Sequence, residues 1–181
     1  MRALFAIALL AAGMMVGVGA TEPTPPHVAR YIADARAAGS GRLTWFGLHV
    51  YDARLYVPQR GFDAALLRNQ AFALELTYAR ALDGRAIAER SRDEIARLGL
   101  GSESQRSRWL SEMTRLFPDV SPGQTIAGIH VPGAGTRFYL DARPLGRIDD
   151  PEFGPAFFAI WLDPRTREPQ LRSSLLKQAA R

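Results

Sequence analysis

One stretch of the chain, residues 41–57, combines aromatic, aliphatic and polar side chains in a pattern suited to holding a small molecule. It contains five aromatic or histidine residues and two glycines. Such a composition favours extended backbone on a half-buried sheet surface. Alternation places one mainly apolar set on a single strand face: Leu43, Trp45, Tyr51, Ala53, Leu55 and Val57, with His49 as the polar exception. The stretch therefore predicts that one face of the sheet forms the floor of a ligand cleft.

The sequence lacks the motifs of metal, nucleophile and dinucleotide chemistry. His27, His49 and His130 are far apart, and none forms an i, i+4 pair with another ligand. Residues 39–41, Gly-Ser-Gly, are not the Gly-x-Ser-x-Gly elbow of acyl transfer. Residues 133–135, Gly-Ala-Gly, lack the third glycine and the helix of a dinucleotide loop. The chain has no Cys, which excludes thiolate catalysis and sulfur-ligated metals. We expect no metal site and no cofactor.

The first twenty residues resemble a targeting segment. Arg2 gives a short positive start, residues 3–10 form a dense apolar run, and residues 18–20 are a small-residue exit. This is typical of a secretory signal peptide cleaved near Ala20. The alternative is an uncleaved anchor, since the apolar run from residue 3 to 20 is just long enough to span a bilayer. We expect a signal peptide at residues 1–20, a periplasmic or secreted protein, and no membrane span after cleavage.

The mature chain would have 161 residues (181 minus 20) and a formal charge of +4 (5 minus the charge of Arg2). This length is enough for one domain with a real core. Basic and acidic residues alternate along the chain, as in residues 90–94, Arg-Ser-Arg-Asp-Glu. Such alternation predicts a solvated surface and no nucleic-acid partner.

The helices and strands are predicted from the periodicity of apolar residues, and their ends from glycine and proline. Residues 21–38 read as a linker and a short helix over His27–Ala37, followed by a turn at residues 39–41. Alternating or short apolar runs predict strands within 41–57 and at 72–78, 124–131, 136–140 and 144–148. Helical spacing predicts helices over 87–98, 109–117, 151–161 (capped by Asp150) and 172–180. The order predicts an α+β domain, an antiparallel sheet covered on one face by a layer of helices.

Two blocks of residues resemble a known family. Gly39-x-Gly41-Arg42 followed by Val50-Tyr51-Asp52-Ala53-x-Leu55-Tyr56 is similar to the start of bacterial chalcone isomerase-like proteins. Residues 146–153, Gly-Arg-Ile-Asp-Asp-Pro-Glu-Phe, and 156–162, Ala-Phe-Phe-Ala-Ile-Trp-Leu, form a second block, which Leu171-Arg172 and Leu175-Leu176 close. The resemblance implies a chalcone isomerase-like domain over residues 39–178, with the open-faced sandwich of that superfamily. It speaks to fold more than to activity.

The resemblance also implies where a site would lie. Chalcone isomerases add a phenolate to an enone within one molecule, which requires a positioned substrate and hydrogen bonds to the developing enolate. Arg42 is the counterpart of the family's Arg and would bind a phenolate, enolate or carboxylate in two-pronged fashion. Tyr51 falls where the family has Thr. Strict alternation puts Arg42 and Tyr51 on opposite faces unless Gly41 or Gly47 marks a bulge or turn.

The chain departs from the catalytic pattern of the plant enzymes. Those enzymes carry Leu-Thr-Gly-x-x-Tyr with Asn seven residues on, whereas this chain reads Leu-Asp-Gly-Arg-Ala-Ile over 82–87 with Glu94 at the later place. Ile87 has no hydroxyl to orient water or a ketone. Glu94 would bring negative charge to an anion that must be stabilised. Both changes argue against ring closure.

The leading hypothesis is therefore an exported, non-catalytic protein that binds a small, partly apolar ligand such as a fatty acid. Arg42 would hold its head group, and Tyr51 or Tyr78 would assist. Two alternatives remain open. One is an isomerase or lyase acting on an enone-like molecule, and the other is an envelope protein-interaction module with no small ligand.

Overall fold

The fold is built on a six-stranded antiparallel sheet in which every strand pairs with the strand next to it in the sequence, in the order β1-β2-β3-β4-β5-β6. The computed structural model describes residues 23–180, so the predicted signal peptide lies outside the described residues. The strands are β1 (Ala35–Trp45), β2 (Leu48–Pro58), β3 (Phe72–Tyr78), β4 (Thr125–Val131), β5 (Gly135–Leu140) and β6 (Arg143–Ile148).

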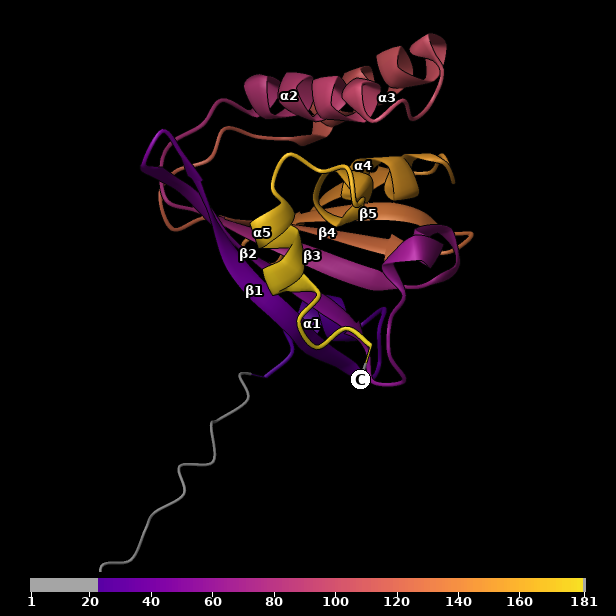
Figure 1. Cartoon of the computed structure of the whole chain (residues 1–181). Helices are drawn as coiled ribbons and strands as arrows, with labels where there is room; N and C mark the ends of the chain where they lie inside the picture. Colours follow the sequence, from indigo (N-terminus) through magenta and orange to yellow (C-terminus); the bar gives the residue numbers. More distant parts are fainter. Residues whose placement is uncertain (1–22, 181) are drawn as a thin grey trace, which may run out of the picture.

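Helices pack on this sheet, mainly on one face (Figure 1). They are α1 (Pro26–Ala29), the 3₁₀ segment η1 (Ala64–Asn69), α2 (Gly84–Arg97), α3 (Glu103–Leu116), α4 (Phe153–Leu162) and α5 (Pro169–Leu175). Helix α4 lies against the sheet, α2 and α3 pair above it, and α5 packs on β1. The predicted α+β class is confirmed. In the described part of the chain, no helix combines the length and apolarity needed to cross a bilayer.

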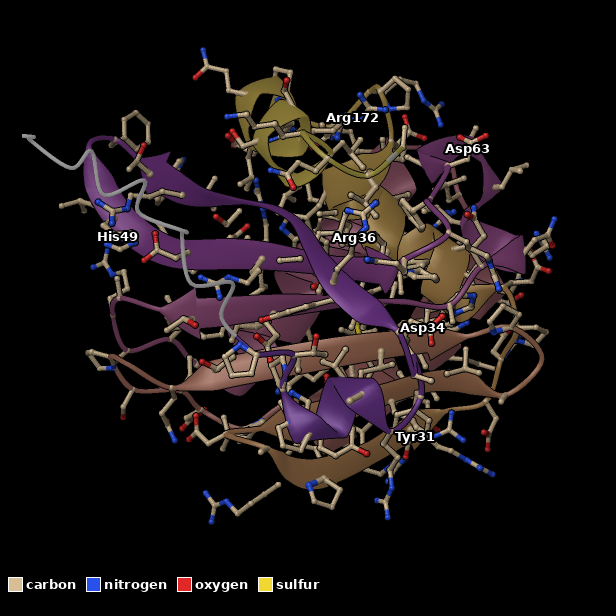
Figure 2. The ribbon with its side chains drawn as sticks, turned by 90° about the horizontal axis from the view of Figure 1, so that it is seen from below. Tyr31, Asp34, Arg36, His49, Asp63 and Arg172 are labelled. Atoms are coloured by element: carbon tan, nitrogen blue, oxygen red, sulfur yellow. The ribbon has the colours of Figure 1, made fainter. Side chains whose placement is uncertain are left out.

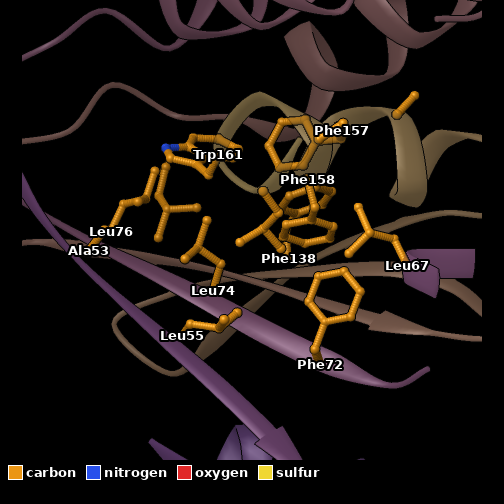
Figure 3. Packing of buried hydrophobic residues seen from close by; sticks show 14 of the residues in the cluster. Ala53, Leu55, Leu67, Phe72, Leu74, Leu76, Phe138, Phe157, Phe158 and Trp161 are labelled. Carbon is orange, nitrogen blue, oxygen red and sulfur yellow. The ribbon is translucent and has the colours of Figure 1, made fainter. Parts of the chain in front are cut away.

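The inner face of the sheet is packed by aromatic side chains of α4 (Figure 3). The Phe158 ring meets Phe72 of β3 edge-on, with 4.8 Å between centroids, and Phe157 meets Phe138 of β5 in the same way at 5.5 Å. Gly128 on β4 makes this close approach possible, because a Cβ there would lie 2.9 Å from the Phe158 ring. Edge-on aromatic pairs and large buried areas make this layer a major source of stability.

Residues 39–41 form part of β1 rather than the predicted turn. Gly39 and Gly41 face α5, and a Cβ on Gly39 would lie 2.0 Å from the Ser174 carbonyl oxygen. A Cβ on Gly41 would lie 2.8 Å from the Leu171 side chain. The glycines therefore let α5 lie directly on the strand, a role that local turn statistics do not reveal.

The predicted helix over His27–Ala37 is wrong beyond its first turn. Helix α1 ends at Ala29, and Ala35 already pairs with Pro58 of β2. Strand pairing has overridden the helix preference of the alanines. The short helix instead covers the outer face of the sheet (Figure 2), where Val28 joins a small apolar cluster and the Tyr31 and Tyr139 hydroxyls lie 3.1 Å apart.

The other predicted helices are present with different bounds, and the last one overlaps its predicted range only over residues 172–175. Helix α4 begins at Phe153, and the Asp150 Oδ1 accepts a hydrogen bond from the Glu152 backbone N–H at 2.9 Å. The last helix spans Pro169–Leu175 rather than residues 172–180. Trp109 is buried as expected, and its indole N–H donates to Asp150 Oδ2 at 2.8 Å.

A buried histidine makes stability depend on pH. His130 of β4 is 2 % exposed, and burial lowers its pKa from the ordinary value of 6.5, against a smaller opposing effect from the Arg68 backbone. Below pH 6.5 the unfolded chain takes up a proton that the folded chain refuses, so stability falls with falling pH until the lowered pKa is reached.

We expect the free energy of unfolding of the wild type to fall between pH 7 and pH 5 more steeply than that of His130→Leu, by up to about 1.4 kcal/mol per pH unit. Urea unfolding at a series of pH values measures both slopes. Comparing slopes rather than absolute stabilities removes the cost of the substitution itself. Equal slopes would show that His130 does not titrate differently in the folded chain.

Candidate functional site

A cavity of about 340 Å³ lies between the inner face of the sheet and helices α2 and α4. Its walls are mostly aliphatic or aromatic, with Leu74 and Leu76 from β3, Phe138 from β5, and Phe157 from α4 among the lining side chains. This volume is at the lower end of the range of small-molecule pockets. The cavity therefore suits an apolar body of modest size.

Helix α2 faces the cavity with a mixed stripe rather than a purely apolar one. Ala86, Ile87, Arg90, Ser91 and Glu94 line the cavity, a spacing that puts them on one side of a helix. The small side chains of Ala86 and Ser91 fill little of the space between the helix and the sheet, and the Ser91 hydroxyl donates back to the Ile87 carbonyl at 2.8 Å. The face of α2 that covers the sheet is thus partly hollow and partly polar.

Two tyrosines from neighbouring strands supply polar groups to the apolar wall. Tyr51 of β2 and Tyr78 of β3 are paired in the sheet, and their rings meet edge-on with 6.0 Å between centroids. The Tyr51 hydroxyl accepts a hydrogen bond from the Trp161 indole N–H at 2.8 Å, which leaves its own proton free to donate. Within residues 23–180 the Tyr78 hydroxyl has no hydrogen-bond partner.

Burial raises the pKa of both phenols well above the ordinary value of 10. For Tyr51 the Trp161 hydrogen bond opposes this effect, and for Tyr78 the neighbouring Tyr51 adds to it. Both hydroxyls therefore stay protonated at neutral pH and act as hydrogen-bond donors on the cavity wall.

One end of the cavity carries a charged cluster centred on Glu94, which is 7 % exposed. Its carboxylate pairs with Arg90 Nη2 at 2.9 Å, Arg97 Nε at 2.7 Å and Arg167 Nε at 3.5 Å. Glu168 also lines this end, and burial, aided by repulsion from Glu94 and opposed by Arg90, raises its pKa. Three guanidinium groups and two carboxylates leave a surplus of one positive charge when both acids are ionised.

Arg42 lies outside the cavity. It stands opposite Asp52 in the β1–β2 pairing, and its Nε donates to Asp52 Oδ1 at 3.0 Å on a largely exposed surface. Gly47 does form a turn, but Leu43, not Arg42, comes to lie opposite Tyr51. The structure therefore brings Tyr51 and Tyr78 together in the cavity and leaves Arg42 on the other face of the sheet.

Several lining residues were not singled out from the sequence. The alternating charges around Arg90 predict a solvated surface, and Arg167 lies in the segment after α4, which no sequence pattern connects to α2. Trp161 appeared only within the second family block. Ile87 and Glu94, the two departures from the plant pattern, both lie on the cavity wall.

In the described residues no group of three or more His, Asp or Glu side chains is arranged to hold a metal ion. What the arrangement can do is enclose an apolar chain and offer two phenol donors and a cationic cluster to a polar head group. Hydrogen bonds to a charged acceptor in such a setting are stronger than neutral ones.

Comparison with known proteins supports the fold. A family model described as chalcone isomerase-like matches residues 36–177. An uncharacterized protein of Haemophilus influenzae is 30% identical over 138 residues, which cover 76% of this chain and 66% of that protein, so the chain spans just under two thirds of the relative. The crystal structure of a fatty-acid binding protein from Arabidopsis thaliana superposes with a TM-score of 0.64 at 16% identity, covering 81% of this chain and 88% of that one.

The charged cluster yields a stability prediction. We expect Glu94→Gln to lower the free energy of unfolding by about 1–3 kcal/mol, because it removes the buried counter-charge of three guanidinium groups. Glu112→Gln on α3 is the matched control, since that exposed carboxylate pairs with Arg115 at 2.7 Å, and its loss should cost less than about 1 kcal/mol. Denaturant unfolding of both variants tests this, and equal effects would show that the Glu94 cluster contributes no more than a surface ion pair.

Proposed function

The chain belongs to the chalcone isomerase-like family, and on that premise we propose that it binds one small amphipathic ligand, such as a long-chain fatty acid, without converting it. The observation that carries this proposal is the apolar cavity with the unpartnered Tyr78 hydroxyl and the proton of Tyr51 available on its wall. Apolar burial would supply most of the affinity, and the polar groups would select the head group.

The ligand's hydrocarbon part would lie against the inner face of the sheet, near Leu74 and Leu76. A carboxylate would be attracted to the charged end, where Arg90 and Arg167 line the cavity and one positive charge is in excess. The guanidinium geometry matches a carboxylate in two-pronged contact. Tyr78 would donate a further hydrogen bond.

The likeness to the Arabidopsis protein, which is called a fatty-acid binding protein, agrees with this ligand class. At 16% identity the likeness concerns the fold, so the ligand rests on the cavity itself. The presence of a cavity also favours ligand binding over a module whose sheet and helices pack without one.

Binding without conversion is favoured over isomerisation by two wall residues. Ile87 presents only hydrocarbon where a ring-closing enzyme of the family needs a hydroxyl, and Glu94 places a carboxylate near any developing enolate. Stabilisation of that charge is the main catalytic requirement of the reaction. The three arginines around Glu94 offset its charge, but pairing with Glu94 takes up part of their donor capacity, which an enolate would need.

The proposal predicts that affinity for saturated fatty acids rises with chain length by about fourfold per methylene until the cavity is filled, because each buried methylene contributes about 0.8 kcal/mol. Tyr78→Phe should weaken binding about tenfold by removing one donor to a charged head group. Ile87→Trp should abolish most binding by filling the cavity. Isothermal titration with acids of eight to sixteen carbons provides the measurement.

Arg42→Ala serves as the control, since this side chain lies outside the cavity and should leave affinity unchanged. A loss of binding in Arg42→Ala with normal binding in Ile87→Trp would place the ligand elsewhere. Affinity that does not depend on chain length would contradict burial of the hydrocarbon chain.

We further propose that the protein is exported, on the basis of the charged start, apolar run and small-residue exit of residues 1–20. Expression with the native N-terminus in a Gram-negative host should give a periplasmic protein whose intact mass corresponds to a chain beginning at Thr21. Ala20→Arg should block this processing, because the cleavage site requires a small residue. A full-length chain that stays with the membrane fraction would support the retained-anchor alternative instead.

A further inference from the structure

The tip of the β1–β2 hairpin exposes three large apolar side chains. Trp45 is 63 % exposed, Phe46 87 % and Leu48 53 %. Among residues 23–180 the remaining exposed large hydrophobic side chain is Leu66 on η1, at 50 %. The hairpin projects as an arm past the neighbouring strands (Figure 1), and His49 marks this end of the sheet, far from Asp63 in the view from below (Figure 2). Three of the four exposed large apolar side chains of the described residues are therefore gathered at the apolar tip, residues 45–48.

The turn between β1 and β2 has an unfavourable backbone conformation. Phe46 has a φ of 47° and Gly47 a φ of 76°, so both central residues adopt the left-handed conformation. Turns of this kind favour Asn-Gly, and a bulky aromatic residue at positive φ is a genuine outlier. The Phe46 ring contacts the Trp45 ring in a tilted arrangement, with 4.9 Å between centroids, and is otherwise exposed to solvent. A residue that costs conformational energy and adds little packing indicates a role outside folding.

The apolar tip is continuous with the cavity. Trp45 belongs to the tip and also lines the cavity, next to Leu43 on the same strand and Val50 on β2. A hydrocarbon chain entering here would meet the apolar side chains of Trp45, Leu43 and Val50. Phe46 and Leu48, by contrast, do not line the cavity.

The tip fits a lipid bilayer better than a protein. Two aromatic side chains and one leucine expose roughly 400 Å² between them, about half of the area per partner that a stable protein interface buries. Tryptophan is favoured at the headgroup level of bilayers, where its ring is apolar and its N–H is hydrated. Exposed Arg42 lies three residues before Trp45, and exposed Arg80 follows Ala79, whose N–H donates to the Val50 carbonyl at 2.9 Å. Exposed guanidinium groups near the tip in the chain are suited to phosphate.

We propose that the apolar tip inserts into the interfacial region of a phospholipid bilayer and that a ligand passes between bilayer and cavity along Trp45. The docking step stands on the tip alone, whereas the transfer step rests on the proposed function. The bilayer supplies the phosphate for the arginines and the apolar medium for Trp45, Phe46 and Leu48.

Tryptophan fluorescence of the whole chain tests the docking step. The chain has three tryptophans, and Trp109 and Trp161 are 2 % and 7 % exposed, so Trp45 is the one available to lipid. With vesicles of phosphatidylcholine and phosphatidylglycerol in a 3:1 ratio, we expect a blue shift and quenching by brominated lipid, and Trp45→Phe should remove both signals. The double variant Phe46→Asn/Leu48→Ser should reduce the quenching of Trp45 at least threefold, and Asn also suits the left-handed turn.

Leu66→Ser is the matched control, because it removes an equally exposed leucine away from the tip and should leave quenching unchanged. Wild-type Trp45 that shows no quenching would overturn the docking proposal, as would equal quenching in the double variant. Sedimentation of the wild type as a dimer that the double variant loses would assign the tip to a second copy of the chain and overturn it too.

Transfer is tested separately from binding. Release of a fluorescent fatty acid from loaded protein to vesicles should slow at least fivefold in Phe46→Asn/Leu48→Ser, while its affinity in vesicle-free buffer equals that of the wild type. Equal release rates would overturn the transfer step. Wild-type protein that binds no fatty acid in buffer would contradict the proposed function. The docking step would still be tested by the quenching of Trp45 fluorescence.

Discussion

The packing of α4 against the inner face of the sheet is the constraint on which the rest of the structure depends. Gly128 lets Phe158 approach the sheet closely, and Phe157 and Trp161 continue the same layer. Helix α2 packs on α3 and α4, and its small side chains leave a gap between the helix and the sheet. The hydrogen bond from Trp161 to Tyr51 links the aromatic layer to the polar wall of the resulting cavity.

The apolar and the charged groups that line the cavity lie in different parts of it. Its sheet side offers hydrocarbon and two neutral phenols, whereas its charged end is an ion cluster that is already largely neutralised by its own partners. Such a division agrees with the proposed binding of an amphipathic molecule, because an apolar body and a charged head group would each meet a matching surface. The fold by itself does not decide the activity.

Periodicity alone was enough to predict the strand β3, the helices α2 and α3, and the inward positions Leu43, Tyr51, Ala53, Leu55 and Val57, because these elements each bury one regular face. Trp45, a member of the same predicted set, is instead largely exposed at the hairpin tip. It could not predict that residues 35–38 join the sheet, since four residues rich in alanine favour a helix until a partner strand is present. The place of Arg42 in a motif predicts that it belongs to the site. Its face of the sheet is set by the register of the hairpin, which includes a shift between Leu43 and Thr44 that the residue types do not encode. Arg167 reaches the cavity only through the tertiary packing of α4.

The strictly sequential pairing of the strands has a consequence for how the chain acquires its shape. Each new strand can add to the one made just before it, so the sheet can grow in the direction of synthesis, although the step from β3 to β4 must close a long connection that contains α2 and α3. Helix α5 is the exception, because it must return from the C-terminus to the two glycines of the first strand. Until α5 is synthesised, β1 lacks the helix that covers Gly39 and Gly41 and offers an uncovered surface to other chains.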